Sequence, residues 1–238
     1  MKLLNKWNQR VARVRQKTTK FGREVKSRLR DQFTKRNKGS FESQFAVDQK
    51  FAQLGYEPLN NTNRYNEVLH GTGYELDPSL SNEETKVFHN PTTRQVSMAY
   101  RGMPLNKPSR WKDLKSDLAI LMGQEKYDTW FKQVNHHFKG VLDKYGDGYN
   151  IDTTGHSLGG QLAKHVNDSH KGRVARNVVF SRGTGLLEPF RKKQGNTVDV
   201  SNKHDVISMG ARLQGGHPVV KTSNKGLLEA HNLGALYH

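Results

Sequence analysis

The segment Gly155-His156-Ser157-Leu158-Gly159-Gly160 restricts the fold more than any other part of this chain. Residues 149–154 before it are rich in strand-forming types, and Leu158, Leu162 and Val166 follow at the four-residue spacing of a helix face. A serine flanked by glycines at a strand-to-helix junction is typical of a nucleophile elbow, in which the serine backbone is strained. The alternative interpretation is a glycine-rich turn with an incidental serine.

Positive charge is concentrated at the start of the chain. The 238 residues carry a formal net charge of +17, and residues 1–40 hold 14 Lys or Arg against Glu24 and Asp31. This segment therefore has a net charge of +12, and the remaining 198 residues carry only +5. Its apolar residues recur at helical spacing: Trp7, Val11, Val14, Phe21, Val25, Leu29 and Phe33.

This pattern predicts a basic amphipathic helical arm over residues 1–40, followed by a domain over residues 41–238. Such an arm can lie on an anionic membrane surface, bind nucleic acid, or dock its apolar face on protein. The sequence favours none of the three decisively, and it leaves the oligomeric state open.

The composition also excludes some classes of protein and site. The chain has no cysteine, which excludes disulfides, thiolate metal sites and a cysteine nucleophile. Its start lacks the apolar core of a secretory signal, and no stretch is long and apolar enough to span a bilayer. We therefore expect a cytoplasmic or peripheral membrane location, with association with a virion as the alternative. The 11 histidines form no convincing ligand pattern, so no metal or organic cofactor is expected.

The remaining elements alternate between strand and helix. Apolar residues predict a helix ending at Gly55, a loop over residues 56–72, and a hairpin of residues 87–89 and 95–100. Helices are expected at residues 113–123 and 127–145, and short strands at residues 178–180, 197–200 and 219–220. This alternation predicts an α/β fold, with a mostly parallel sheet covered by helices on both faces.

A serine hydroxyl needs a base, usually histidine, and a carboxylate that orients this base. In α/β-hydrolases these partners follow the serine along the chain. Asp205 is the expected acid because it lies in a loop just past a predicted strand, whereas its rival Asp199 lies within that strand. His231, which follows the last predicted strand, is the expected base, and His217 is the second choice.

Acyl transfer also needs hydrogen-bond donors for the oxyanion of the tetrahedral intermediate. One expected donor is the backbone N–H of Leu158, directly after the serine. The second is the N–H of Met103, because Arg101-Gly102-Met103 follows the predicted strand 95–100.

Taken together, these motifs resemble the lipase class 3 family, α/β-hydrolases that include fungal triacylglycerol lipases. The similarity covers roughly residues 75–238 and is strongest from Val134 through the Gly155–Gly160 segment to Ala163. The resemblance implies a Ser157–Asp205–His231 triad and an oxyanion hole of the Met103 and Leu158 amides. The family commonly has Thr or Ser where this chain has Met103, so a side-chain hydroxyl donor is absent here.

Two functional hypotheses follow. The first is a serine ester hydrolase of the lipase or phospholipase type, with no cofactor, whose cationic arm binds anionic lipid surfaces. The second is a catalytically weak or inactive lipase-like fold that serves as a structural protein, or as one that binds nucleic acid or an assembly such as a virion. A complete Ser-Asp-His set favours the first.

Overall fold

A computed structural model of the protein describes residues 45–103, 125–183 and 195–201. The chain divides into two compact units, Met1–Phe45 and Ala46–His238, and the account below concerns the second. The arm over residues 1–40 and the elements predicted at residues 113–123 and 219–220 lie outside the described residues. The helical arm and the boundary between residues 40 and 41 therefore stay predictions.

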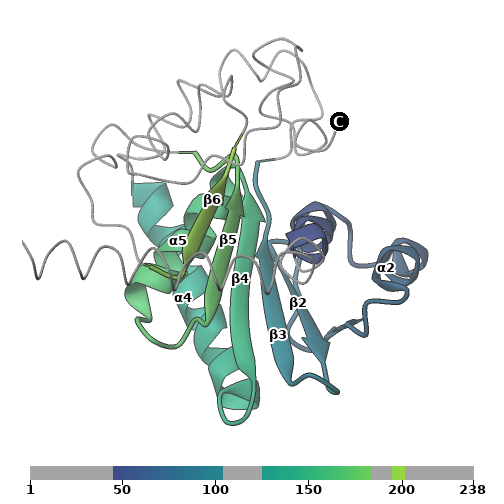
Figure 1. Cartoon of the computed structure of the whole chain (residues 1–238). Coiled ribbons are helices and arrows are strands. Elements are labelled where there is room, and N and C mark those ends of the chain that lie inside the picture. Colours follow the sequence, from purple (N-terminus) through teal and green to yellow (C-terminus); the bar gives the residue numbers. More distant parts are fainter. Residues whose placement is uncertain (1–44, 104–124, 184–194, 202–238) are drawn as a thin grey trace, which may run out of the picture. The chain divides into compact units, whose positions relative to one another are not determined.

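The described part of the domain is built on one sheet whose strands follow each other in chain order (Figure 1). The strands are β1 (Glu75–Leu76), β2 (Thr85–Asn90), β3 (Gln95–Tyr100), β4 (Asn150–His156), β5 (Arg176–Phe180) and β6 (Thr197–Val200). Strands β1 to β3 pair antiparallel, and β3 to β6 pair parallel. The predicted mostly parallel α/β sheet is confirmed.

Because β3 to β6 run in the same direction, their carboxyl ends lie along one edge of the sheet, which we call the carboxyl edge. In the pairing register, Tyr100 lies beside Gly155, His156 beside Phe180, and Phe180 beside Val200. Ligands of open α/β sheets usually bind beyond this edge. The residues that follow the four strands are therefore the first place to look for a site.

The predicted hairpin is confirmed, because β2 and β3 pair from Thr85 opposite Tyr100 to Asn90 opposite Gln95. The Asn90 side chain closes its turn, since Oδ1 accepts hydrogen bonds from the amides of Thr92 and Thr93, each at 3.0 Å. Asparagine favours such turns because its short side chain reproduces a backbone turn.

Helices α4 (Glu125–Tyr145) and α5 (Leu158–Ser169) cover one face of the sheet. Alternate β2 and β3 residues reach this face, where they pack in one cluster with both helices, as expected for a pleated strand. The cluster includes Val87, Val96, Met98, Tyr100, Val134, Phe138, Val141, Ile151, Leu162, Val166 and Val179. The helix predicted at residues 127–145 is thus confirmed.

The other face is covered by the helical residues 45–54 and by α2 (Thr62–Leu69). Phe51 stacks on Phe88 of β2 with ring centroids 4.6 Å apart, and Tyr65 and Leu69 of α2 join the same cluster. Helices therefore lie on both faces, as predicted (Figure 1).

The prediction of a loop over residues 56–72 is wrong, because α2 lies within it. The Asn61 side chain caps this helix by accepting a hydrogen bond from the Arg64 amide. Tyr65 and Leu69, four residues apart, are its two buried residues. Asparagine is a preferred N-cap, and one narrow apolar stripe is enough for a short helix packed against a core.

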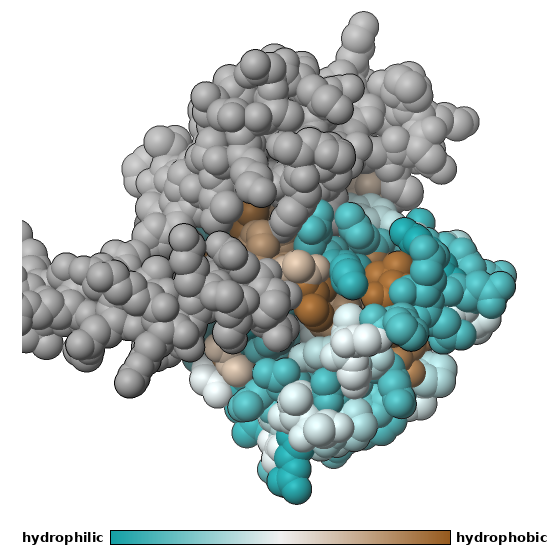
Figure 2. Space-filling model, turned by 45° about the vertical axis from the view of Figure 1, so that its right-hand side comes forward, coloured by the Kyte–Doolittle hydropathy of each residue, from teal (hydrophilic) through white to brown (hydrophobic). Residues whose placement is uncertain are grey.

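The described helices include none that is long and apolar enough to cross a membrane. In the view of Figure 2, most of the described surface is hydrophilic, and apolar residues appear in small groups between hydrophilic ones. The large apolar side chains of the two clusters are buried.

A buried cluster of charged residues connects the helical residues 45–54 to the sheet. The Arg176 guanidinium of β5 contacts both carboxylate oxygens of Asp48 and lies 3.0 Å from Oδ2 of Asp152 on β4. Asp48 is 1% exposed and Asp152 7% exposed, so both charges depend on this partner. The helix preceding Tyr56 is therefore held in a defined position on the sheet.

A second buried carboxylate, Asp77, joins the segment after β1 to the end of α4. Its Oδ2 accepts hydrogen bonds from Lys144 and Tyr145, each at 2.7 Å, and its Oδ1 accepts from the Ser79 amide and hydroxyl. Burial by itself raises the pKa of the Asp77 carboxyl. The hydrogen bonds from Lys144, Ser79 and Tyr145 outweigh burial and hold this pKa below its ordinary value.

Asp77→Asn is therefore expected to lower the free energy of unfolding at neutral pH by about 1–3 kcal/mol, the usual cost of a lost buried hydrogen-bonded charge. A carboxyl whose pKa is lowered by folding stabilises the protein fully above its ordinary pKa of about 4. This contribution decreases as pH falls below that value and is lost by the time pH has passed through the folded pKa. Urea unfolding between pH 7 and pH 3 should thus show a smaller loss of stability with acid in Asp77→Asn.

The matched control is Glu67→Gln, which removes a carboxylate paired with Arg64 at 2.9 Å on the exposed surface of α2. An exposed pair of this kind contributes less than about 1 kcal/mol. Equal destabilisation by the two substitutions would contradict the role assigned to Asp77.

Candidate active site

Ser157 lies between the end of β4 at His156 and the start of α5 at Leu158, as the sequence predicts. Its backbone has φ 56° and ψ −122°, a region that residues with side chains rarely adopt. Although Ser157 occupies the N-cap position of α5, its side chain makes no capping hydrogen bond to this helix. The strand, the strained serine and the helix together have the backbone geometry of a nucleophile elbow.

Two glycines of the elbow are required by close contacts between backbones. A Cβ on Gly155 would lie 2.4 Å from the carbonyl carbon and oxygen of Gly159. A Cβ on Gly159 would lie 2.1 Å from the carbonyl oxygen of Tyr100 at the end of β3. Backbone atoms cannot retreat as a flexible side chain can, so only glycine fits either position. These contacts explain why both positions in this strand-to-helix turn are glycine.

Backbone hydrogen bonds hold the strained serine from both directions. The Ser157 amide donates to the Phe180 carbonyl at 3.0 Å, which continues the pairing of β4 with β5. The Ser157 carbonyl accepts from Gly183 and from Gln161, each at 3.3 Å. The segment after β5 therefore supports the elbow directly.

The proposed oxyanion segment lies beside the elbow. Gly102, directly after the end of β3, is so close to β4 that a Cβ there would lie 2.6 Å from the His156 carbonyl oxygen. Met103 follows it and is half-buried. Leu158 is the first residue of α5, where a backbone N–H has no acceptor within its own helix. The residues on which the two predicted donors depend are thus neighbours at the carboxyl edge.

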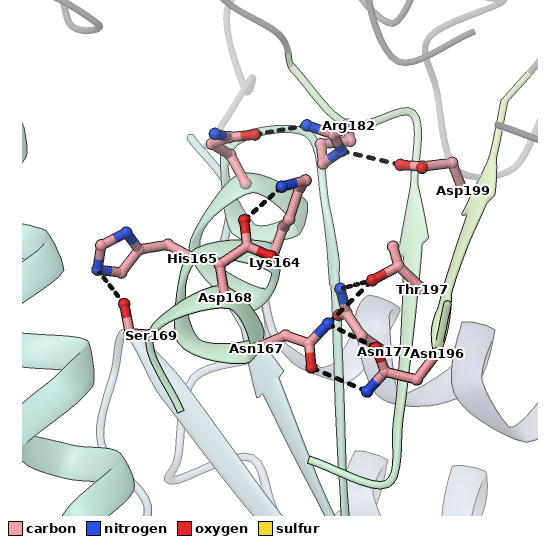
Figure 3. Close-up of polar contacts among 11 residues, drawn as sticks. Lys164, His165, Asn167, Asp168, Ser169, Asn177, Arg182, Asn196, Thr197 and Asp199 are labelled. Atoms are coloured by element: carbon pink, nitrogen blue, oxygen red, sulfur yellow. Dashed lines mark hydrogen bonds and ion pairs between the residues drawn. The ribbon is translucent and has the colours of Figure 1, made fainter. Parts of the chain in front are cut away.

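Asp199, the rival acid, takes part in a buried ion pair. It lies in β6, it is buried, and its Oδ1 accepts a hydrogen bond from Arg182 at 2.8 Å (Figure 3). Arg182 is itself fully buried and also donates to Oε1 of Gln161 on α5. This ion pair occupies Asp199 and helps to hold β6 and α5 together. It is consistent with the prediction that another carboxylate is the triad acid.

A polar network next to this pair ties α5 to the start of β6. Asn167 donates to Oδ1 of Asn196 at 3.0 Å and to Oγ1 of Thr197 at 2.9 Å (Figure 3). Asn196 returns a hydrogen bond to Oδ1 of Asn167 at 2.9 Å. Buried networks of this kind fix the position of a helix when their members are satisfied.

A second strained residue, Ser181, follows β5. Its φ is 45°, its amide donates to the Val200 carbonyl at 2.6 Å, and its buried hydroxyl has no hydrogen-bond partner among the described residues. Strained backbone is concentrated at functional sites because the surrounding structure can hold it there. Two of the three described non-glycine residues with positive φ, Ser157 and Ser181, lie at the carboxyl edge.

The structure therefore brings together Ser157, Leu158 and the Gly102–Met103 segment. The predicted acid Asp205 and the predicted base His231 lie outside the described residues, as does His217. The described ranges contain no group of three or more His, Asp or Glu arranged to hold a metal ion. The residue that sequence reasoning missed is Tyr56, whose hydroxyl lies 2.9 Å from Nδ1 of His156. No signal in the sequence relates these two residues, which are 100 positions apart.

Comparison with known families bears on the same segment. Residues 90–174 match the lipase (class 3) family. The matched range contains β3, α4, β4, the elbow and α5. The resemblance to lipase class 3 that the sequence motifs indicate is thereby confirmed, and it supports a lipid ester hydrolase.

Solved structures with a similar fold include lipases. The Lip2 lipase from Yarrowia lipolytica has 16% sequence identity and a TM-score of 0.49, covering 72% of this chain and 74% of that one. A lipase from Rhizopus microsporus var. chinensis has 15% identity and a TM-score of 0.47, with coverages of 69% and 68%. A predicted CIB-like hydrolase from Thermoplasma acidophilum has 14% identity and a TM-score of 0.37, with coverages of 68% and 91%. A comparison with curated proteins finds no match.

Proposed function

We propose that this protein is a serine-dependent carboxylic ester hydrolase that acts on lipids. The observation that carries the proposal is the backbone of Ser157, held at φ 56° between β4 and α5 by glycines that no other residue can replace. Strained backbone of this kind is concentrated at functional sites, and a nucleophile must project beyond the sheet to meet its substrate. The match of residues 90–174 to lipase (class 3) supports the lipid class of ester.

In the proposed mechanism, His231 takes the proton of the Ser157 hydroxyl as its oxygen attacks the ester carbonyl carbon. Asp205 orients His231 and stabilises its imidazolium. The Met103 and Leu158 amides bind the oxyanion. Collapse of this intermediate breaks the ester bond, and the departing alcohol takes the proton from His231. Water then attacks the acyl-serine by the same route and releases the fatty acid.

The basic arm over residues 1–40 indicates where the substrate is located. Its net charge of +12 and the apolar face of its predicted helix suit an anionic lipid surface, where each Lys or Arg contributes about 1 kcal/mol to binding. A lipase must reach acyl esters that lie within such a surface. We therefore assign membrane phospholipids or other membrane acyl esters as the substrate class.

The test is release of fatty acid by the full-length protein from phosphatidylcholine vesicles with and without phosphatidylglycerol. Anionic lipid is expected to raise the rate at least about tenfold at low salt, and this advantage should shrink as salt screens the arm. Ser157→Ala is the control for a contaminating lipase. Absence of release from every vesicle by folded protein, together with salt-sensitive binding to DNA, would support the alternative of an inactive binding protein.

A further inference from the structure

Tyr56 is the residue at the carboxyl edge that the proposed mechanism does not use. It follows the helical residues 45–54 after a single glycine, and its hydroxyl lies 2.9 Å from Nδ1 and 3.4 Å from the carbonyl oxygen of His156. The two rings are tilted against each other with centroids 5.9 Å apart. Tyr56 thus contacts both the side chain and the backbone of the residue that precedes Ser157.

The same hydroxyl also contacts the end of β3. A Cβ on Gly102 would lie 2.1 Å from the Tyr56 oxygen, so the absence of a side chain on Gly102 makes room for the phenol. The Gly102 backbone lies close enough to this phenol to act on its pKa. One oxygen atom therefore bridges the ends of β3 and β4.

Each bridged residue immediately precedes a proposed oxyanion segment. Gly102 precedes Met103, and His156 precedes the Ser157–Leu158 pair. We infer that Tyr56 is a positioning residue, whose hydroxyl fixes the separation of the Met103 and Leu158 amides and so the width of the oxyanion hole. This inference rests on the proposed function, because it assigns to Tyr56 an effect on the oxyanion donors of that site.

The phenol is suited to this role because it keeps its proton. Burial raises the pKa of the Tyr56 hydroxyl well above its ordinary value, although the Arg101 charge and the Gly102 backbone act to lower it. A protonated phenol that donates to Nδ1 fixes His156 as the tautomer with its proton on Nε2. His156 then accepts this hydrogen bond as part of the bridge between the ends of β3 and β4.

Tyr56 is itself held firmly. Its amide donates to the Gln53 carbonyl at 3.1 Å, so it continues from the last turn of the helical residues 45–54. That helix is fixed to the sheet by the stacking of Phe51 on Phe88 and by the ion pair of Asp48 with Arg176. A donor fixed in this way can set the geometry of oxyanion donors before the substrate arrives, which is the condition for electrostatic catalysis.

The experiment compares Tyr56→Phe with Tyr65→Phe in the full-length protein. The Tyr65 hydroxyl donates to the Glu57 carbonyl at 2.9 Å, so Tyr65→Phe also removes one partly buried hydrogen bond to backbone but leaves the contacts of Tyr56 with His156 and Gly102 in place. Four quantities are measured for each variant: the rate constant of fluorophosphonate labelling, the final labelled fraction, and kcat and KM on a soluble p-nitrophenyl ester.

We expect Tyr56→Phe to lower kcat and the labelling rate constant about tenfold, because small displacements of oxyanion donors act on the transition state. KM should change less than about twofold, since ground-state binding is not altered. The labelled fraction should remain that of the wild type, and Tyr65→Phe should leave all of these quantities within about twofold.

A pair of substitutions at His156 tests the bridge from its other end and covers the case in which Tyr56→Phe does not fold. His156→Asn retains an oxygen that can accept from Tyr56, whereas His156→Leu has a similar size and no acceptor. If the bridge positions the oxyanion donors, His156→Asn should keep most of the wild-type kcat. The kcat of His156→Leu should then be about tenfold lower than that of His156→Asn.

The outcomes separate the two proposals. A folded wild-type protein that neither labels nor hydrolyses would refute the proposed function. A wild type that labels, with a Tyr56→Phe variant that labels at the same rate, would refute the positioning role alone. A lower labelled fraction at an unchanged rate constant would also refute it, because that result describes a merely structural residue.

Discussion

Ser157→Ala is expected to lower kcat for ester hydrolysis by at least about 10⁴-fold and to abolish fluorophosphonate labelling. The physical reason is the loss of the only atom that forms the acyl-enzyme in the proposed mechanism. The fold should survive, because the elbow is held by the Ser157 backbone amide and carbonyl and not by a side-chain cap. Initial rates and labelling of purified protein measure the effect, and circular dichroism checks the fold.

Ser169→Ala is the matched control for this prediction. Ser169 is exposed at the end of the same helix, where its hydroxyl lies 3.3 Å from Nε2 of His165. Its loss should leave kcat and labelling unchanged. Activity that persists in Ser157→Ala would remove Ser157 from the mechanism, and the strained elbow would then need another explanation.

Gly159→Ala carries the largest expected effect on stability, a loss of at least about 3 kcal/mol in the free energy of unfolding. The added Cβ would lie 2.1 Å from the Tyr100 carbonyl oxygen and 2.9 Å from the Arg101 carbonyl carbon. Both contacts are backbone atoms, so relief requires α5 to move away from β3. Urea unfolding at neutral pH measures the loss, and hydrolysis should fall with it because the same movement displaces the Leu158 amide.

Gly140→Ala introduces the same side chain, but it is expected to raise the free energy of unfolding. Gly140 lies within α4, and a Cβ there would meet only the Cδ2 atom of Leu80 at 3.9 Å, an ordinary contact. Alanine favours a helix interior by about 0.5–1 kcal/mol over glycine. Destabilisation by both variants, or by neither, would show that the close contact at Gly159 does not control stability.

The sequence predicts the elements whose signals are local. The strands β3 to β6 and helix α5 follow from short apolar runs and four-residue spacing around the Ser157 elbow. Helix α4 follows from the apolar face of Phe131, Val134 and Phe138. These patterns are visible because each element buries one regular face.

Elements with weaker local signals were missed or predicted wrongly. The composition of α2 is polar, and only Tyr65 and Leu69 reveal its buried face. Strand β1 has two residues and exists through its pairing with β2, a tertiary contact that no short pattern records.

The candidate site likewise contains residues that a local motif predicts and residues whose role depends on tertiary contacts. The Ser157 elbow is predicted from a motif, since the glycines that surround it are required by backbone geometry. The pairing of Asp199 with Arg182 is not predicted, because it depends on two strands lying side by side. Tyr56 is hidden for the same reason. Asp205 and His231 stay predictions, supported by the motif order of the family and by the assignment of Asp199 to another partner.

The hydrogen bond from the Ser157 amide to the Phe180 carbonyl also bears on how the protein matures. The elbow belongs to β4, but its backbone is completed only when β5, some 20 residues later in the chain, has paired with it. Because the strands are arranged in the order of synthesis, a nascent chain that ends before β5 lacks the Phe180 carbonyl that accepts from the Ser157 amide. The strained backbone of the serine is thereby fully supported only after the sheet has assembled as far as β5.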